Sequence, residues 1–301
     1  YVGALDGRLI AIDAKTGKEV WSTVTVDQTK SYTITGAPRV VKGNVIIGNS
    51  GGEYGVRGYV SAYDAETGEL VWRFYTVPPI PGAGPDGAAS DPMIAAAQAT
   101  WAGDWSELGG GGTVWDAIVY DEDYNQVLVG VGNGSPWPRS LRSEGQGDNL
   151  FISSVLALDA DTGEYKWHYQ GTPGEEWDFT QTQPIILATL EIDKEPRKVM
   201  MQAPKNGFFY VIDRSNGKLV SAENYVPQNW TTGIDLETGR PKVAPDARYV
   251  DDEVFVALPS GHGGHNWQPM AYHPDTGLVY IPAQEIALAY KASQPFEVRV
   301  G

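Results

Sequence analysis

Several stretches of this sequence place polar side chains between glycines or beside tryptophans, where a ligand could lie close to the chain. The first stretch, residues 50–58, holds Glu53 among four glycines, between an apolar run at 45–47 and an expected strand at 59–63. Because glycine has no Cβ, such a segment allows the backbone to approach a bound molecule. On its own, the stretch reads equally well as a long glycine-rich hairpin with a solvated glutamate.

Two further stretches offer a flat aromatic face and an amide oxygen. Residues 109–112 are all glycine, which again permits the close approach of a ligand to the backbone, and they precede Thr113 and Trp115. The indole of Trp115 offers a large flat face, although a core tryptophan is the plainer interpretation. Asn133 lies between two glycines at the end of an expected strand. An amide oxygen is a ligand for hard cations such as calcium, and an ordinary Asn-Gly turn is the alternative.

Acidic and basic side chains follow later in the chain. The segment 172–180 carries Glu175, Glu176 and Asp178 beside a tryptophan, and Lys205 stands before an apolar run that reads as a buried strand. These residues add three carboxylates and one ammonium group to the candidate set.

The segment 261–267 contains a second kind of candidate. Its His262 and His265 are spaced as a metal-binding pair could be. Because no third ligand of matching type accompanies them, a histidine-bound metal is not expected there.

Composition excludes several classes of protein. The 301 residues are 42% apolar and 20% charged, which is typical of a globular chain. The 38 acidic and 22 basic residues give a net charge of −16, which argues against a nucleic-acid partner. No apolar run approaches the roughly 20 residues of a membrane helix. The absence of cysteine excludes disulfides, zinc-thiolate sites and cysteine nucleophiles within this chain.

An internal repeat indicates the fold. The segment Leu9–Trp21 recurs as Val60–Trp72 and as Val155–Trp167, each time with an Asp-x-x-Thr-Gly turn and a final tryptophan in register. The aspartate can accept backbone N–H groups, the glycine supplies a positive φ, and the tryptophan can pack between neighbouring units. Asp13 and Asp64 are 51 residues apart. This period predicts an all-β protein, a β-propeller with Trp-docking repeats. A β-sandwich with coincidental turns is the alternative.

Three segments interrupt the repeat, and function is expected where they lie: residues 78–103, 134–148 and 261–267. The interval of 95 residues between Asp64 and Asp159 is long enough to predict an intervening blade without the full motif.

Both ends of the sequence read as interrupted strands. The chain begins with Tyr1–Ala4 and stops with Val298–Gly301, equally abruptly. We therefore expect residues 1–301 to be a partial propeller domain, truncated at both ends, so the lack of a signal peptide is uninformative.

The candidate residues occur in a fixed order along the chain: Thr35, Ser50 to Glu53, Thr113 with Trp115, Asn133, Trp177 with Asp178, Lys205 to Gly207, and Asn266 with Trp267. Interleaved with the tryptophan repeats, this order resembles the PQQ-dependent alcohol dehydrogenases, the quinoprotein and quinohaemoprotein family. The resemblance covers the whole chain and keeps the family's approximate spacing. It implies an eight-bladed propeller with PQQ and a calcium ion on its axis, of which about five blades would be present here.

The resemblance also implies roles for individual residues. Glu53 and Asn133 look like the protein ligands of the calcium ion, and Asp178 beside it looks like the general base and a further ligand. Trp115 looks like the floor on which PQQ stacks, and Lys205 like the cation beside the quinone oxygens. Further contacts to PQQ are implied for a set spread over several loops: Thr35, Ser50, Gly51, Gly52, Thr113, Asn266 and Trp267.

The implied activity is the oxidation of primary alcohols by hydride transfer to calcium-bound PQQ, with the electrons passed to a cytochrome c or haem domain in the periplasm. The family's adjacent-cysteine disulfide and an early glutamate contact have no counterpart in this chain. No Cys-x-x-Cys-His motif is present, so haem c is expected only in a longer protein. Lanthanide-using members carry a second aspartate where Thr180 stands here, so calcium is the expected metal.

Two alternatives remain open at this point. The first is a non-enzymatic propeller that serves as a scaffold for protein assembly and shares the tryptophan repeat. The second is a PQQ glucose dehydrogenase, which the cofactor residues alone do not exclude.

Overall fold

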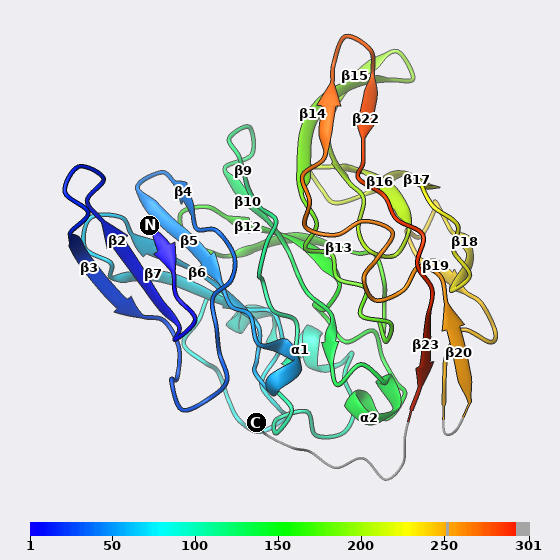
Figure 1. Cartoon of the computed structure of the whole chain (residues 1–301), viewed down its shortest axis with the longest axis horizontal. Coiled ribbons are helices and arrows are strands. Elements are labelled where there is room, and N and C mark those ends of the chain that lie inside the picture. Colours follow the sequence, from blue (N-terminus) through cyan, green and yellow to red (C-terminus); the bar gives the residue numbers. More distant parts are fainter. Residues whose placement is uncertain (251–252, 293–301) are drawn as a thin grey trace.

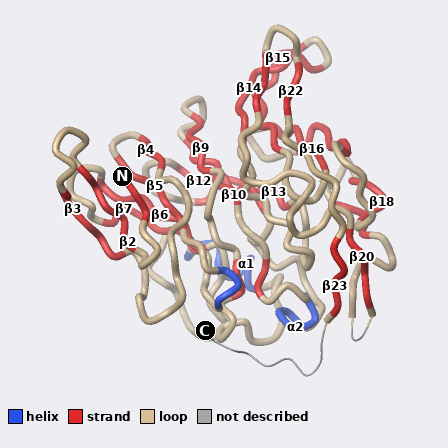
Figure 2. Tube along the Cα trace, viewed as in Figure 1, coloured by secondary structure: helices blue, strands red, loops and turns tan. Residues whose placement is uncertain are grey.

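The computed structural model describes residues 1–250 and 253–292, which form short strands and long loops (Figure 2). The C-terminal stretch Val298–Gly301, predicted to be an interrupted strand, lies outside the described residues. The helical elements are short: η1 (Gly52–Tyr54), η2 (Asp91–Met93), α1 (Ile94–Gln98) and α2 (Arg139–Ser143). The predicted all-β class is confirmed.

Antiparallel sheets follow one another in chain order across the molecule (Figure 1). The first has three strands: β1 (Val2–Gly3), β2 (Arg8–Ile12) and β3 (Glu19–Val24). The second has four: β4 (Arg39–Val41), β5 (Asn44–Gly48), β6 (Tyr59–Asp64) and β7 (Leu70–Tyr75). The third has four: β9 (Ile118–Asp121), β10 (Gln126–Gly130), β12 (Ser154–Asp159) and β13 (Tyr165–Gln170). The fourth has four: β14 (Ile185–Ile192), β15 (Glu195–Gln202), β16 (Phe208–Asp213) and β17 (Leu219–Asn224).

In the first three sheets, the repeat forms the last two strands, and its tryptophan packs on a glycine of the next sheet. In the turn between β6 and β7, the Asp64 carboxylate accepts the backbone N–H of Thr67 at 2.8 Å. The indole of Trp72 packs on Gly163 in the next sheet, where an added Cβ would lie 2.6 Å from the ring. The same indole donates its N–H to the carbonyl of Ala160 at 3.3 Å. Glycine is therefore required at position 163 both by its positive φ and by the docked ring of Trp72.

The apolar core lies between neighbouring sheets. Strand β10 shows this most clearly, because its two faces contribute to two different clusters. Val127 and Val129 pack with Val60 and Phe74 of the second sheet, whereas Leu128 packs with Met200 and other residues of the fourth. Burial of each such side chain stabilises the fold by about 1.5–3 kcal/mol. A sheet covered on both faces in this way fits the predicted propeller architecture.

The prediction of an extra blade between Asp64 and Asp159 is wrong. The interval is occupied by the third sheet alone together with two long connections, residues 76–117 and 131–153. The first connection contains η2 and α1, and the second contains α2. The two connections pair with each other through β8 (Gly110–Gly111) and β11 (Gly134–Ser135).

The C-terminal part of the described chain forms strand pairs: β18 (Thr231–Ile234) with β19 (Pro241–Val243), β20 (Val254–Ala257) with β23 (Leu288–Lys291), and β21 (Ala271–His273) with β22 (Leu278–Tyr280). They lie beside the fourth sheet (Figure 1). The count of about five blades stays a prediction.

Candidate functional site

The sheets bring corresponding loops to one side of the molecule. Strands β5, β10 and β15 are each the second strand of a four-stranded sheet, and the loops that follow them carry Glu53, Asn133 and Lys205. The connection from β13 to β14 adds Asp178. Side chains that are 27 to 80 residues apart in sequence therefore come into contact.

These loops enclose a cavity of about 320 Å³. It is lined by Thr35, Ser50, Gly51, Glu53, Thr113, Trp115, Asn133, Trp137, Asp178, Thr180 and Lys205. A volume of this size is typical of a pocket for a small molecule or cofactor. Nine of the residues predicted to bind PQQ or calcium or to act as the base line it, and their roles stay predictions.

Glu53 and Asn133 form the first polar pair of the cavity. The Asn133 side-chain amide donates to Glu53 Oε1 at 3.0 Å, and Asn133 is buried. Asn133 directly precedes β11, and its backbone carbonyl accepts the N–H of Gly112 at 2.8 Å, which holds it in place. The two segments cross so closely that a Cβ on Gly111 would lie only 2.6 Å from this carbonyl oxygen. The glycines before Thr113 are thus needed where two protein segments cross, which differs from the expected approach of backbone to ligand.

Asp178 and Lys205 form the second polar pair. Lys205 Nζ lies 3.0 Å from Asp178 Oδ2, and their side chains are 7% and 16% exposed, respectively. Burial raises the pKa of Asp178 to about 7, against the opposing effect of the Lys205 charge. Asp178 also adopts a left-handed backbone conformation with φ 63°. A carboxylate with a pKa near neutrality in a cavity is suited to accept a proton from a bound molecule.

Hydroxyl groups and an aromatic ring complete the cavity. Thr35 Oγ1 and Ser50 Oγ lie 2.6 Å apart and share a hydrogen bond, and Thr113 is buried beside them. Trp115 is half-buried and adds its indole to the lining. Gly52 is buried behind the lining, where a Cβ would meet Thr113 at an ordinary distance of 3.4 Å.

Two predicted contacts to PQQ belong to the segment 261–267, which approaches the cavity at Gly261, where a Cβ would lie 3.1 Å from Asp178 Oδ2. Asn266 donates to the carbonyl of His262, and Trp267 is 60% exposed; neither lines the cavity. Both ring nitrogens of His265 lie 2.7 Å from backbone carbonyl oxygens of Ala203 and Gln268. His265 is thereby engaged within the fold.

Sequence reasoning assigned no role to Trp137, which lines the cavity. Its buried indole Nε1 has no hydrogen-bond partner in the part of the chain that the structure describes. The only sequence signal was its place between two prolines within a segment that interrupts the repeat.

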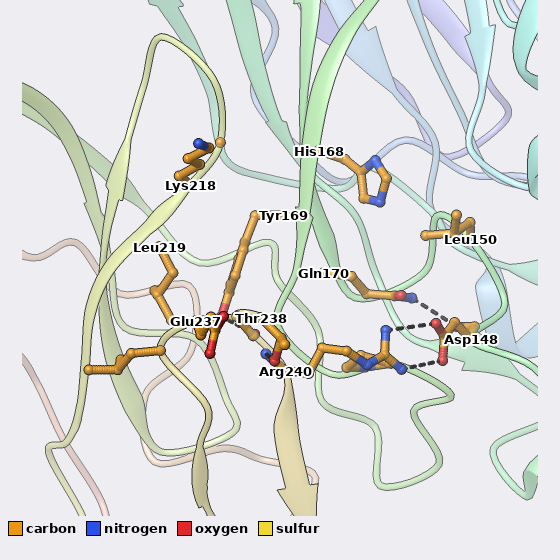
Figure 3. A pocket seen from close by; sticks show the side chains of 14 residues that line it. Asp148, Leu150, His168, Tyr169, Gln170, Lys218, Leu219, Glu237, Thr238 and Arg240 are labelled. Atoms are coloured by element: carbon orange, nitrogen blue, oxygen red, sulfur yellow. Dashed lines mark hydrogen bonds and ion pairs between the residues drawn. The ribbon is translucent and has the colours of Figure 1, made fainter.

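A larger cavity of about 430 Å³ lies elsewhere, along β13 and the turns at Gly217 and Gly239 (Figure 3). Two of its charged side chains pair with each other, since Arg240 makes two hydrogen bonds to the Asp148 carboxylate at 2.9 and 2.8 Å. None of the residues predicted to be functional lines it. The smaller cavity is the better candidate site because it is lined by two carboxylates, an ammonium group and a side-chain amide.

The donors around the smaller cavity fit a calcium ion and an anionic planar cofactor. The described residues contain no cluster of three His, Cys, Asp or Glu side chains that could hold a metal by itself. Glu53, Asn133 and Asp178 nevertheless offer oxygen donors, which calcium prefers, and a cofactor could supply the others. The ammonium of Lys205 and the hydroxyls of the lining suit carboxylate groups, and Trp115 suits a planar ring.

Fold and cavity together define a propeller-type domain built to bind a cofactor, and comparison with known proteins places it in a family. The family model described as "Glucose/ethanol/alcohol dehydrogenase, beta-propeller domain" of PQQ proteins matches residues 1–248. The chain therefore belongs to the PQQ-dependent dehydrogenase family. The predicted resemblance and β-propeller fold are confirmed.

Individual relatives support this assignment. The quinohemoprotein alcohol dehydrogenase ADH IIB of Pseudomonas putida is 60% identical over 97% of this chain and 42% of its own length. The solved structure of quinohemoprotein alcohol dehydrogenase ADHIIG from Pseudomonas putida HK5 has a TM-score of 0.95 and 56% identity, over 100% of this chain and 44% of that one. A europium-containing methanol dehydrogenase has a TM-score of 0.89 and 36% identity, over 99% and 52%.

The chain spans about two fifths of the length of these curated relatives. The scaffold interpretation is not favoured, because the relatives that match over nearly the whole chain are named as alcohol dehydrogenases. Among the described residues, no helix has the length and apolar character needed to span a membrane.

Proposed function

We propose that this chain forms the PQQ- and calcium-binding part of an enzyme that oxidises primary alcohols. The observation that carries the proposal is the convergence of Glu53, Asn133, Asp178 and Lys205 on one cavity beside Trp115. Membership of the PQQ dehydrogenase family and the names of the relatives support it.

The residues of the cavity would divide the binding of the two groups. The oxygens of Glu53, Asn133 and Asp178 would hold calcium, while Trp115 and Lys205 would orient PQQ. When bound, PQQ supplies a two-electron acceptor, and calcium supplies the Lewis acid that makes its carbonyl reactive. Further contacts to PQQ are proposed for a set around the same loops: Thr35, Ser50, Gly51, Gly52, Thr113, Asn266 and Trp267.

Asp178 would accept the hydroxyl proton of the alcohol. Burial raises the pKa of its carboxyl group, while Lys205 and a bound calcium ion would both favour the anionic form that can accept a proton. Lys205, 3.0 Å away, holds the carboxylate in one place and favours its anionic form.

Calcium is proposed over a trivalent ion because of Thr180. This residue lines the cavity where a second carboxylate would stand in the lanthanide-using pattern. Its hydroxyl already accepts hydrogen bonds from Thr182 Oγ1 at 3.1 Å and Gln183 Nε2 at 2.9 Å. A divalent ion needs less anionic charge from the protein, so Glu53 and Asp178 would suffice.

The whole protein is proposed to work in the periplasm and to pass electrons to a cytochrome c or to a haem domain of its own chain. A small alcohol is the proposed substrate.

The test is reconstitution of the full-length protein with PQQ and calcium, followed by oxidation assays with an artificial electron acceptor. Primary alcohols of increasing length should be oxidised, and glucose should not. Turnover of glucose with no alcohol oxidation would instead support the PQQ glucose dehydrogenase alternative. Absence of turnover with both substrates, in protein shown to hold PQQ, would refute the proposal.

A further inference from the structure

Glu175 is completely buried and does not line the cavity, and within the described residues its carboxylate accepts hydrogen bonds from three backbone N–H groups. Oε1 accepts the N–H of Trp177 at 2.6 Å and that of Phe179 at 2.8 Å. Oε2 accepts the N–H of Gly134 at 3.1 Å. Burying a carboxylate costs free energy unless it is paired and hydrogen-bonded, so these three bonds point to a specific role for Glu175.

The three donors flank the residues proposed to do the chemistry. Trp177 and Phe179 are the neighbours of Asp178, and Gly134 follows Asn133. Asp178 needs such support, because its left-handed φ of 63° is unfavourable for a residue with a Cβ. Bonds on both sides of Asp178 fix this conformation, and the bond to Gly134 ties it to a loop 41 residues away.

We infer that Glu175 is a positioning residue that locks the loop of the proposed base Asp178 to the loop of the proposed metal ligand Asn133. This inference rests on the proposed function and assigns a residue that does not itself line the cavity. One carboxylate thereby sets the separation of two groups that must act on the same bound molecules. Outer partners of this kind commonly change metal affinity or activity by about 10–100-fold when they are removed.

Arg142 of α2 offsets the buried charge. Its guanidinium is buried and attracts the Glu175 carboxylate, and it donates to the backbone carbonyl of Glu175 and to the Asn149 side chain. The charge of Glu175 therefore has a partner in the fold, whereas the directions of its two oxygens are set by the site loops. A substitution can therefore remove the hydrogen bonds of Glu175 to the two loops while it keeps the negative charge beside Arg142.

Glu176 provides a matched control in the adjacent position. It is 3% exposed, and its carboxylate accepts the backbone N–H of Arg139 at 3.2 Å and lies 3.1 Å from Arg248 Nη1. Neither contact involves the backbone N–H groups beside Asp178 and Asn133 that Glu175 binds. Arg248 does lie over the ring of Trp177, with its Cζ 5.0 Å from the ring centroid. Glu175 and Glu176 are thus the same residue type with similar burial, and only one of them binds the site loops.

The experiment compares E175Q, E175D and E176Q in the full-length protein reconstituted with PQQ. In E175Q, one side of the carboxyl group becomes an N–H donor, so the contacts to the two loops cannot all be kept. E175D keeps the charge beside Arg142 but is one methylene shorter, so it cannot reach both loops. Calcium affinity is measured by titrating stripped, PQQ-loaded protein with calcium while following PQQ absorbance. The kcat and KM for a primary alcohol are measured separately.

Both Glu175 variants should bind calcium about 10–100-fold more weakly and lose about 10-fold or more in kcat at saturating calcium. The KM for alcohol should change less than kcat, and E176Q should stay within about three-fold of wild type in each quantity. If E175D keeps wild-type calcium affinity and kcat, or if E176Q loses as much as E175Q, the inference is overturned. Loss of the fold in both Glu175 variants but not in E176Q would also overturn it, and would assign Glu175 to the fold instead. A wild-type protein that holds PQQ but oxidises no alcohol would count against the proposed function. The calcium affinities of the three variants would still test this inference.

Discussion

Trp115 and Trp72 are both tryptophans at loop or strand positions, but the structure gives them different surroundings. Trp72 is a buried docking residue that packs on Gly163. Trp115 is half-buried and faces the cavity. Replacing a fully buried tryptophan by alanine costs about 3–5 kcal/mol of stability, so Trp72→Ala should destabilise the apoprotein by that amount.

Trp115→Ala should instead weaken PQQ binding. One face of an indole corresponds to roughly 100 Å², about half the area that a tryptophan can bury, and at ~25 cal/mol per Å² this is ~2.5 kcal/mol. The dissociation constant of PQQ should therefore rise by roughly 60-fold. Trp115→Ala should cost the apoprotein less stability than Trp72→Ala, because the half-buried side chain of Trp115 loses less protein contact when it is removed.

The assay is a PQQ titration of each full-length apoprotein, followed by fluorescence, beside thermal unfolding of the same samples. Trp115→Phe keeps a flat ring and should recover most of the affinity. If Trp115→Ala binds PQQ as wild type does and loses about 3–5 kcal/mol of stability, Trp115 is a core residue and the reasoning is refuted.

Two further predictions follow from the same structure. Burial lowers the pKa of His168 below its usual value of about 6.5, so its contribution to stability is complete above pH 6.5 and is lost as the pH falls, by at most about 1.4 kcal/mol per pH unit. H168Q in the full-length protein should show a flatter dependence of Tm on pH between about 5 and 7; an unchanged dependence would contradict this. For the metal, chelator-stripped full-length protein should regain activity with PQQ and calcium, and Glu53→Ala should abolish that recovery. Recovery with a light lanthanide alone, at equal free concentration, would show that Thr180 was misread.

Local patterns in the sequence predicted the repeating part of the fold well. The Asp64 turn and the docking of Trp72 on Gly163 depend on a few neighbouring residues and on one packing contact that recurs. A fixed period reveals such contacts without knowledge of the rest of the structure. The resemblance to the PQQ-dependent alcohol dehydrogenases brought Glu53, Asn133 and Asp178 together as site residues. Glu53 and Asn133 each follow the second strand of a sheet, whereas Asp178 lies on the connection between two sheets.

Features that depend on contacts between distant loops could not be predicted in this way. The missing blade before Asp159 reflects two insertions that pair through β8 and β11, and such pairing leaves no periodic signal. The glycine run before Thr113 was interpreted as a ligand approach because the crossing segment around Asn133 is remote in sequence. Glu175 reads as one acid among three until its backbone partners are known.

The central claim is that Asp178 is the base of an alcohol-oxidising site, and Asp178→Asn tests it most directly. Asparagine has nearly the same shape and keeps an oxygen donor for calcium, but it accepts no proton at neutral pH. Measurement at saturating calcium therefore separates the proton transfer from any weaker binding of the metal. The full-length variant should hold PQQ and calcium, with bound PQQ verified by absorbance, while kcat for a primary alcohol falls by about 10²-fold or more. A variant that holds both groups and turns over within a few-fold of wild type at saturating calcium would contradict the account.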